Sequence, residues 1–424
     1  MGEGFSKCDP GNGLKGTQVV DCGRPDVHGL QLMAKVSAPV RYLRGMLFQG
    51  VVGQAGVKQR LLQSSREGRV SHALLFFGPP GSGVLPMAMA FAQYLNCEQP
   101  GEIDSCGLCG SCRRATKLEH PDIHYVYPVV TGIVKNPRSV DFVADWRKAV
   151  LADPYLSLND WIDLLTGGDA KTKQGNIPVE EAQDIVHKIN LKAFEGRYKV
   201  IILWMPEKMG PATANKLLKS LEEPPEDTVF ILASEARDQL LPTILSRTQL
   251  VKLNRLAEEE VAEVLQQTAG LSTNDAAELA RLADGNFSMA MELASREKGG
   301  GSYEEAFLQW MRLCFNPFKS MEPLLAWVEG MAAESREQQK QFLASCLIMV
   351  RECMLVNTAD GPLVKLNIAQ RAAIQKFLPF VNLVNVEPFT SILNEGIFHL
   401  ERNAHAKILF LDLSLKLSRV LQLK

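Results

Sequence analysis

Short apolar runs alternate with amphipathic segments between residue 46 and about residue 252. The apolar runs predict β-strands at residues 73–77, 122–129, 198–204 and 228–233. The spacing of apolar residues between them predicts helices, among them residues 84–95 and 212–221. Strands that alternate with helices are typical of an α/β fold with a parallel sheet. We therefore predict an α/β domain over residues 46–252.

The strand pattern disappears after residue 253. Amphipathic spacing predicts helices at residues 258–268, 274–283 and 288–296, with Gly285 as a stop after the second. The glycine run at residues 299–301 is typical of a linker, and residues 302–424 are helical in pattern. We therefore predict a small all-α domain over residues 253–301 and a larger all-α domain over residues 302–424.

Residues 1–45 carry scattered glycine and proline and show no sustained helical or strand period. Regular patterning begins at Met46. We interpret Met46 as the natural start of the protein and residues 1–45 as a disordered or misassigned upstream extension. The alternative is a genuine but flexible N-terminal tail.

Composition narrows the class of protein. The chain has 424 residues, of which 46% are hydrophobic and 22% are charged, as in ordinary globular proteins. No apolar run approaches the roughly 18 to 20 residues that span a bilayer, and the N-terminus lacks a secretory signal. We therefore expect a cytoplasmic protein without a membrane partner. The net charge of −2 argues against a protein that coats nucleic acid through bulk positive charge.

A glycine-rich turn, Gly-Pro-Pro-Gly-Ser-Gly-Val-Leu at residues 78–85, follows the first predicted strand. The glycines of a P-loop hold phosphates with backbone N–H groups and a helix N-terminus, and the matching positions here are Gly78, Gly81 and Gly83. A P-loop continues with Lys and with Ser or Thr. Val84 and Leu85 instead offer neither a cation for phosphate nor a hydroxyl for Mg²⁺. We expect no efficient ATP hydrolysis; weak nucleotide binding and a chance glycine turn stay open.

The acidic pair that orients Mg²⁺ in such ATPases is also missing. The apolar run at residues 199–203 is followed by Trp204 and Met205 where Asp and Glu would be expected. Glu207 is nearby, but at two residues' distance we expect it to point elsewhere. The cation, the hydroxyl and the acidic pair are therefore lost together, which indicates a retained fold with its hydrolysis discarded.

Four of the nine cysteines form a cluster with the spacing C-x8-C-x2-C-x2-C, namely Cys97, Cys106, Cys109 and Cys112. In a reducing cytosol such a cluster favours a metal site over disulfides. Two-residue gaps let successive thiolates turn onto one tetrahedral ion, and we expect Gly107 and Gly110 to supply the turns. Four thiolates without an open position predict a structural Zn²⁺ site. Free thiols are the alternative.

In this order the features resemble the AAA+ clamp-loader family of bacterial DNA polymerase III, and in particular its ATPase-inactive members. The resemblance depends on the stretches at residues 52–54, 71–73, 97–112, 120–122, 214–225 and 243–247. It covers residues 46–300 well and the remainder only by helical character. It implies an AAA+ P-loop α/β domain with a parallel sheet, followed by an all-α lid and an all-α collar that joins a ring of related chains.

The resemblance also implies one residue with a catalytic role. In this family a Ser-Arg-Cys motif supplies an arginine to the ATP site of the adjacent subunit, and the chain has Ser246-Arg247-Thr248. Arg247 is therefore the candidate catalytic residue in trans, since a guanidinium can bridge phosphate oxygens. A solvated surface arginine is the alternative. The nucleotide-sensing Gly-x-x-Arg of active members is here Gly285-Asn286-Phe287-Ser288, without the arginine.

We therefore predict a non-hydrolysing clamp-loader subunit with structural zinc. The implied partners are gamma/tau-type and delta-type subunits in a hetero-oligomeric ring, with the sliding clamp and primed DNA reached through the complex. The alternatives are an active gamma/tau-like ATPase, which Val84 and Trp204 oppose, and a zinc-ribbon nucleic-acid-binding module, which the charge opposes. The sequence assigns no role to residues 130–176, which contain Trp146 and Trp161.

Overall fold

The computed structural model describes residues 47–167, 175–296, 303–317, 321–334, 336–358, 375, 377–402 and 404–423. The expected extension at residues 1–45 and the predicted linker at residues 299–301 lie outside this part of the chain. Among the described residues no helix is long and apolar enough to cross a membrane.

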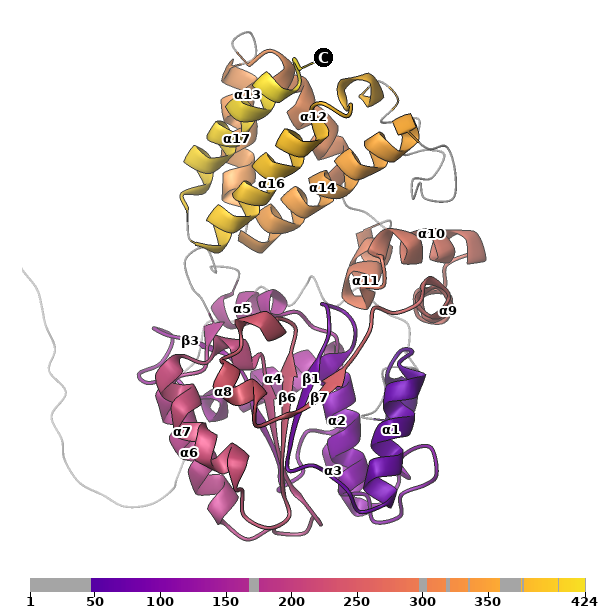
Figure 1. Cartoon of the computed structure of the whole chain (residues 1–424), viewed down its shortest axis with the longest axis vertical. Coiled ribbons are helices and arrows are strands. Elements are labelled where there is room, and N and C mark those ends of the chain that lie inside the picture. Colours follow the sequence, from indigo (N-terminus) through magenta and orange to yellow (C-terminus); the bar gives the residue numbers. More distant parts are fainter. Residues whose placement is uncertain are drawn as a thin grey trace, which may run out of the picture.

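A five-stranded parallel sheet forms the centre of the N-terminal part (Figure 1). Its order is β2-β5-β6-β1-β7. The bounds are β1 (Ala73–Phe77), β2 (Ile123–Val126), β5 (Lys199–Trp204), β6 (Thr228–Ser234) and β7 (Gln249–Lys252). The predicted parallel α/β sheet is therefore confirmed. Strand β7 was not predicted, because its four residues are largely exposed at the edge of the sheet and carry no apolar run.

Two layers of helices bury the sheet. Alternate residues of the central strands point to opposite faces, so Ile202 and Ile231 pack on one side while Ile201 and Phe230 pack on the other. The first face is covered by α1 (Ala55–Arg66), α2 (Val84–Leu95) and α3 (Gly110–Thr116), and the second by α6 (Val179–Asn190) and α7 (Pro211–Glu222). Burial on both faces explains why β5 and β6 are continuous apolar runs in the sequence.

The predicted strand at residues 122–129 divides in the structure. Strand β2 ends at Val126, and the chain pairs again only as β3 (Val129–Val130), antiparallel to β4 (Gly175–Asn176) in a separate small sheet. Pro128 lies between them and has no N–H to continue the first ladder.

The segment without an assigned role is a packed addition at this point. It contains η4 (Ser139–Phe142), α4 (Val143–Ala152) and α5 (Leu158–Thr166). The ring of Trp146 stacks on Tyr127 at 4.0 Å and lies 5.0 Å from Trp204 at the end of β5. Trp161 donates a 2.7 Å hydrogen bond from Nε1 to the Pro128 carbonyl. The insertion is therefore joined to the main core through aromatic side chains.

Three short helices follow the sheet, α9 (Glu258–Ala269), α10 (Thr273–Ala283) and α11 (Phe287–Arg296). They confirm the three helices predicted here. Gly285, at φ +76°, lies between α10 and α11 as the expected stop. These helices share a hydrophobic cluster that also includes Val52 and Tyr155 from the N-terminal part.

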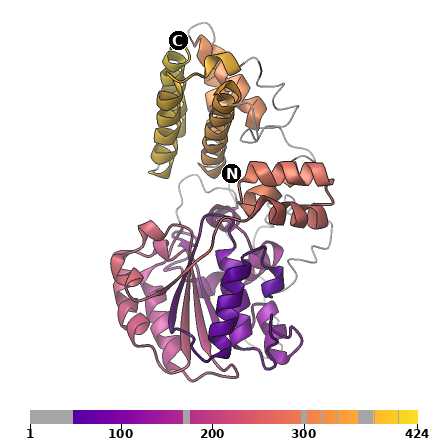
Figure 2. The same cartoon turned by 45° about the vertical axis from the view of Figure 1, so that its right-hand side comes forward.

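The remaining described helices pack around a separate core. They are α12 (Tyr303–Phe315), α13 (Met321–Ala333), α14 (Arg336–Thr358), η8 (Leu378–Phe380), α16 (Val386–Glu401) and α17 (Ala406–Val420). Trp310 stacks on Trp327 at 5.1 Å within this core. The view in Figure 2 and that in Figure 1 both show α9–α11 between the sheet and these C-terminal helices. The predicted helical character of residues 302–424 holds for the residues that the structure describes.

Candidate functional site

The four clustered cysteines meet in space. Cys97 follows α2, Cys109 is the N-cap of α3, and Cys112 is fully buried in α3. The four Sγ atoms all lie within 4.8 Å of one another, and those of Cys106 and Cys112 are 3.9 Å apart. A tetrahedral ion with metal–sulfur bonds of about 2.3 Å separates its sulfurs by about 3.8 Å. The cluster could therefore hold a metal ion.

Backbone N–H groups point at three of these sulfurs. The N–H groups of Cys106, Cys109 and Cys112 donate to Sγ of Cys97, Cys106 and Cys109 at 3.2, 3.3 and 3.4 Å. Burial raises the pKa of Cys106, but the N–H groups of Cys109 and Leu108 outweigh it and lower the pKa to about 6. Burial raises the pKa of Cys97 and Cys112 instead. Donors aimed at sulfur therefore favour the thiolate, the form that binds metal, at Cys106.

Only one of the two expected glycine turns is present. Gly107 has φ +69°, in the left-handed region that favours glycine, and it carries the chain from Cys106 toward α3. The expectation for Gly110 was wrong. This residue has no positive φ and is the first residue of α3, because Cys109 already ends the turn by capping the helix.

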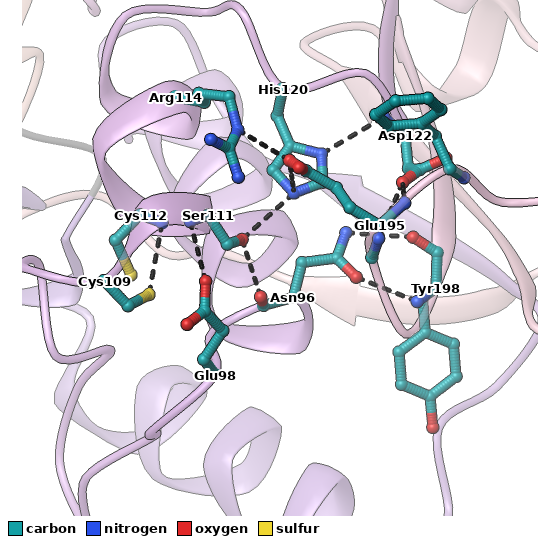
Figure 3. Close-up of polar contacts among 12 residues, drawn as sticks. Asn96, Glu98, Cys109, Ser111, Cys112, Arg114, His120, Asp122, Glu195 and Tyr198 are labelled. Carbon is teal, nitrogen blue, oxygen red and sulfur yellow. Dashed lines mark hydrogen bonds and ion pairs between the residues drawn. The ribbon is translucent and has the colours of Figure 1, made fainter.

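A buried polar network lies behind the cysteines (Figure 3). The hydroxyl of Ser111, in α3, donates to the Asn96 carbonyl at 2.6 Å and lies 3.0 Å from His120 Nε2. His120 Nδ1 accepts from the Asp122 N–H at 3.1 Å, so the ring proton is on Nε2, which donates to Ser111. Burial lowers the pKa of His120, which keeps the ring neutral.

The same network holds the loop that precedes β5. The Asp122 carboxylate accepts hydrogen bonds from the N–H groups of Phe194, Glu195 and Gly196 at 2.7, 2.8 and 2.7 Å. The Asn96 side chain exchanges two hydrogen bonds with the backbone of Tyr198. The cysteine insert and the loop at residues 194–198 are therefore one connected unit. The sequence pointed to residues 120–122 only through the family resemblance, because the loop that Asp122 holds is more than 70 residues away.

The loop at residues 78–85 connects β1 to α2 as a P-loop would. The Gly78 N–H donates to the Ser234 carbonyl at the end of β6. The side chains of Val84 and Leu85 are each 3% exposed and belong to the hydrophobic core. Every residue of α2 is buried. The positions that would offer a cation and a hydroxyl to phosphate are therefore used for packing.

Other parts of this chain lie directly on the loop. The Phe287 N–H donates to the Gly81 carbonyl at 3.3 Å, and a Cβ at Gly81 would lie 2.0 Å from Asn286 Oδ1. A Cβ at Gly83 would lie 3.2 Å from the ring of Tyr155. Glycine is required at both positions because no side chain fits under these neighbours. Neither contact could be read from the sequence, since the partners come from the insertion and from α11.

The end of β5 lacks the acidic pair of an active site. Trp204 and Met205 are buried, and Met205 has a left-handed φ of 54°. Glu207, in η6 (Pro206–Lys208), accepts hydrogen bonds from the Ser234 hydroxyl at 2.8 Å and the Glu235 N–H at 3.3 Å. Burial, together with the charge of Glu207, raises the pKa of Glu235 to about 7. Glu207 therefore links the ends of β5 and β6.

Arg247 follows the short helix α8 (Pro242–Leu245) and lies half-buried at the surface. Its Nε donates to Glu222 at the end of α7 at 2.9 Å, and its Nη1 donates to the Thr243 carbonyl at 3.1 Å. Thr248, where the family motif has cysteine, is buried and donates to the Ile244 carbonyl. An exposed ion pair of this kind contributes roughly 0–1 kcal/mol, so Arg247 can exchange Glu222 for another anion.

Comparisons with known proteins found relatives among the subunits of DNA polymerase III. The family model described as DNA polymerase III, delta subunit matches residues 53–257. Subunit delta' of Pseudomonas aeruginosa is 29% identical over 228 residues, which are 50% of this chain and 57% of that protein. Subunit tau of Bacillus subtilis is 28% identical over 221 residues, 52% of this chain and 31% of that protein. Over this part, the chain is therefore similar to clamp-loader subunits of DNA polymerase III.

The chain spans about a third of the tau relative and somewhat more than half of the delta' relative. The two kinds of subunit match at nearly the same identity, so identity does not distinguish them. The matched residues 53–257 contain the cysteine cluster, the loop at residues 78–85 and Arg247. All candidate site residues therefore lie in the part that carries the family likeness.

The carboxylate of Asp122 stabilises the α/β part of the chain by accepting three backbone hydrogen bonds. Asp122→Asn is expected to lower the free energy of unfolding by about 1–3 kcal/mol, because the amide turns an NH₂ group toward backbone N–H donors. Burial raises the pKa of Asp122, but the N–H groups of residues 194–196 outweigh it and lower the pKa below its ordinary value. The contribution is present at neutral pH and is lost as the pH falls through the lowered pKa. Thermal unfolding across that range measures both effects.

Asp141→Asn is the matched control. Its exposed carboxylate accepts one hydrogen bond, from the Arg138 N–H at 2.9 Å. We expect a loss within about 0.5 kcal/mol, as for most surface substitutions. Equal losses for the two variants would show that the buried position of Asp122 contributes nothing of its own.

Proposed function

We propose that this chain is a delta-prime-type subunit of the bacterial DNA polymerase III clamp loader that does not hydrolyse ATP. It stabilises the ring and supplies Arg247 to the ATP site of a neighbouring subunit. That neighbour's ATP cycle then drives the loading of the sliding clamp on primed DNA. The observation that carries the proposal is an asymmetry: the groups that would serve the chain's own nucleotide are replaced, while the group that would serve a neighbour is kept.

The residues that replace the nucleotide-binding groups have packing or hydrogen-bonding roles of their own. Val84 and Leu85 lie in the core, where they bind neither phosphate nor Mg²⁺. Trp204 packs against Trp146 of the insertion, where an active member would present a carboxylate. Ser288 stands where active members have the nucleotide-sensing arginine, and its hydroxyl donates to the Tyr155 carbonyl at 2.6 Å.

The group that is kept for a neighbouring ATP site is Arg247. Its side chain is 30% exposed, and its ion-pair partner, Glu222, is itself 57% exposed. A guanidinium in this position can reach an incoming phosphate, and its planar fork matches phosphate oxygens better than a lysine would. In other phosphoryl-transfer systems such an arginine contributes about 10³ to 10⁵ in rate.

We further propose that the four-cysteine cluster binds Zn²⁺ as a structural ion. Four sulfur ligands and no nitrogen or oxygen ligand favour zinc among the divalent metals of a cell, and four protein ligands leave no open position for chemistry. The ion would hold the cysteine loop, which has little core of its own. Asp104 supports this loop by accepting hydrogen bonds from the N–H groups of Phe48 and Gln49.

The proposed domain boundaries follow the family plan. Residues 46–252 would be the AAA+ domain, residues 253–301 the lid and residues 302–424 the collar. The proposed partners are gamma/tau-type and delta-type subunits, with the sliding clamp and primed DNA reached through the complex. The C-terminal part of the chain exposes several apolar side chains that would suit a ring contact: Leu325, Leu383, Phe398 and Ile408.

The decisive experiment reconstitutes the clamp loader of the same organism with wild-type protein or with Arg247→Ala. We expect the complex to assemble in both cases. DNA- and clamp-stimulated ATPase should fall by about an order of magnitude or more in the variant, because the neighbour loses its stabilising charge. Arg247→Lys should not restore the rate, since an ammonium lacks the bidentate fork.

Arg138→Ala is the control for this experiment. Arg138 pairs with Asp184 at 3.0 Å, with a side-chain exposure of 41%, so it is also a surface arginine held by a carboxylate. Wild-type ATPase is expected for this variant. If Arg247→Ala also keeps the wild-type rate, Arg247 is not the trans-acting residue. Rapid hydrolysis by the lone wild-type chain would instead support an active gamma/tau-like ATPase.

The metal proposal has its own test. Protein purified in reducing buffer without chelator is expected to carry about one zinc per chain by elemental analysis. Cys112→Ser should reduce the zinc content to near zero and destabilise the N-terminal part by several kcal/mol, on the order of what structural zinc supplies to small modules. Cys353→Ala, at a buried cysteine of α14, should leave the zinc content unchanged. Metal-free wild-type protein would overturn the proposal.

A further inference from the structure

We propose that Tyr155 takes the place of a nucleotide in this chain. It fills the space between the loop at residues 78–85 and helix α11, and it holds the two together. Tyr155 lies between α4 and α5, within the insertion at residues 130–176 to which the sequence assigns no role, and its side chain is 5% exposed. The inference rests on the proposed function only in assuming that the chain does not turn over ATP.

One set of contacts joins Tyr155 to the α/β part. Its hydroxyl accepts a 2.8 Å hydrogen bond from the buried N–H of Val52, just before α1. Its ring lies over Gly83, the N-cap of α2, where a Cβ would be 3.2 Å from both Cε1 and the hydroxyl oxygen. The N-terminus of the helix after a P-loop is where phosphate binds, so the phenol ring covers that position.

A second set joins the same residue to the lid helices. The Tyr155 carbonyl accepts a 2.6 Å hydrogen bond from the Ser288 hydroxyl, in the first turn of α11. The Tyr155 and Phe287 rings meet edge to face, with centroids 4.7 Å apart. The N–H of Tyr155 donates to the Asp153 carboxylate at 2.8 Å. This bond fixes the backbone conformation of the segment between α4 and α5 that carries Tyr155. One residue therefore contacts both halves through hydrogen bonds and through its ring.

These contacts coincide with the two positions that would recognise a nucleotide. Gly83 belongs to the phosphate loop, and Ser288 occupies the place of the nucleotide-sensing arginine. A nucleotide links the loop and the lid only while it is bound, whereas a covalently attached side chain links them permanently. The lid of this subunit should therefore keep one orientation whether or not ATP is present. The loop can admit a nucleotide only if the segment around Tyr155 moves away.

Hydrogen–deuterium exchange of the full-length protein tests the proposal, because it reports local opening at individual segments. The informative amides are those of Val52, which bonds the Tyr155 hydroxyl, and Phe287, which bonds the Gly81 carbonyl. Tyr155→Ala is expected to speed exchange at both segments by about tenfold or more, since it removes the ring and the hydroxyl together. Millimolar Mg-ATP should change neither segment in the wild type.

Tyr127→Ala is the matched control. Tyr127 is also a buried tyrosine, and its hydroxyl donates to the Ser139 carbonyl at 2.6 Å, but its ring packs on Trp146 and Trp161. The Tyr127→Ala variant should leave hydrogen–deuterium exchange at Val52 and Phe287 near the wild-type rate. Equal acceleration in both alanine variants would indicate general destabilisation and overturn the proposal. Wild-type exchange in Tyr155→Ala, or protection of the loop by Mg-ATP, would overturn it as well.

Two gentler variants keep the test decisive if the alanine variants do not fold. Tyr155→Phe removes only the hydroxyl and should speed exchange at Val52. Ser288→Ala removes only the donor to the Tyr155 carbonyl and should speed exchange at Phe287. Wild-type rates in both would refute the proposal. The lone chain is used throughout, so the result is independent of the effect of Arg247→Ala in the assembled clamp loader.

Discussion

The close approach of three segments at the loop between β1 and α2 is the constraint on which the rest of the structure depends. Gly81 and Gly83 have no Cβ, and only for that reason can Asn286 and Tyr155 come so near the backbone. The sheet, the insertion and the lid helices meet at these two residues. In an ATPase the same absence of side chains leaves room for phosphates. Here the room is used for protein, so the same glycines position the lid.

The polar chemistry of a nucleotide site has been replaced by apolar packing around this point. Val84 and Leu85 extend the core beneath α2, and Trp204 joins the aromatic cluster of the insertion. Each replacement removes a charged or hydroxyl group whose burial without a ligand would cost free energy. The α/β fold is thereby kept while the positions that would bind phosphate and Mg²⁺ are used for packing. Arg247 is partly exposed and takes no part in this packing, as its proposed role requires.

The cysteine insert is stabilised mainly by hydrogen bonds and not by apolar packing. Its short loop buries little apolar surface, and a hydrogen-bond network fixes it to the rest of the fold. His120 and Asp122 connect α3 to the loop before β5, and Asp122 alone satisfies three backbone N–H groups. A buried network of this kind is stable only when every member is paired. A metal on the four sulfurs would act on the same module from its other side.

The sequence by itself determined the elements whose signal is local. Continuous apolar runs specified β5 and β6, the glycine frame specified the loop between β1 and α2, and the C-x8-C-x2-C-x2-C spacing specified the cysteine cluster. Tertiary structure alone decided three other features: the edge strand β7, the pairing of Arg247 with Glu222, and the place of Tyr155 on the loop. Those features depend on partners from 25 to more than 130 residues away along the chain. A local pattern specifies burial and backbone conformation, but it cannot specify which distant surface completes a contact.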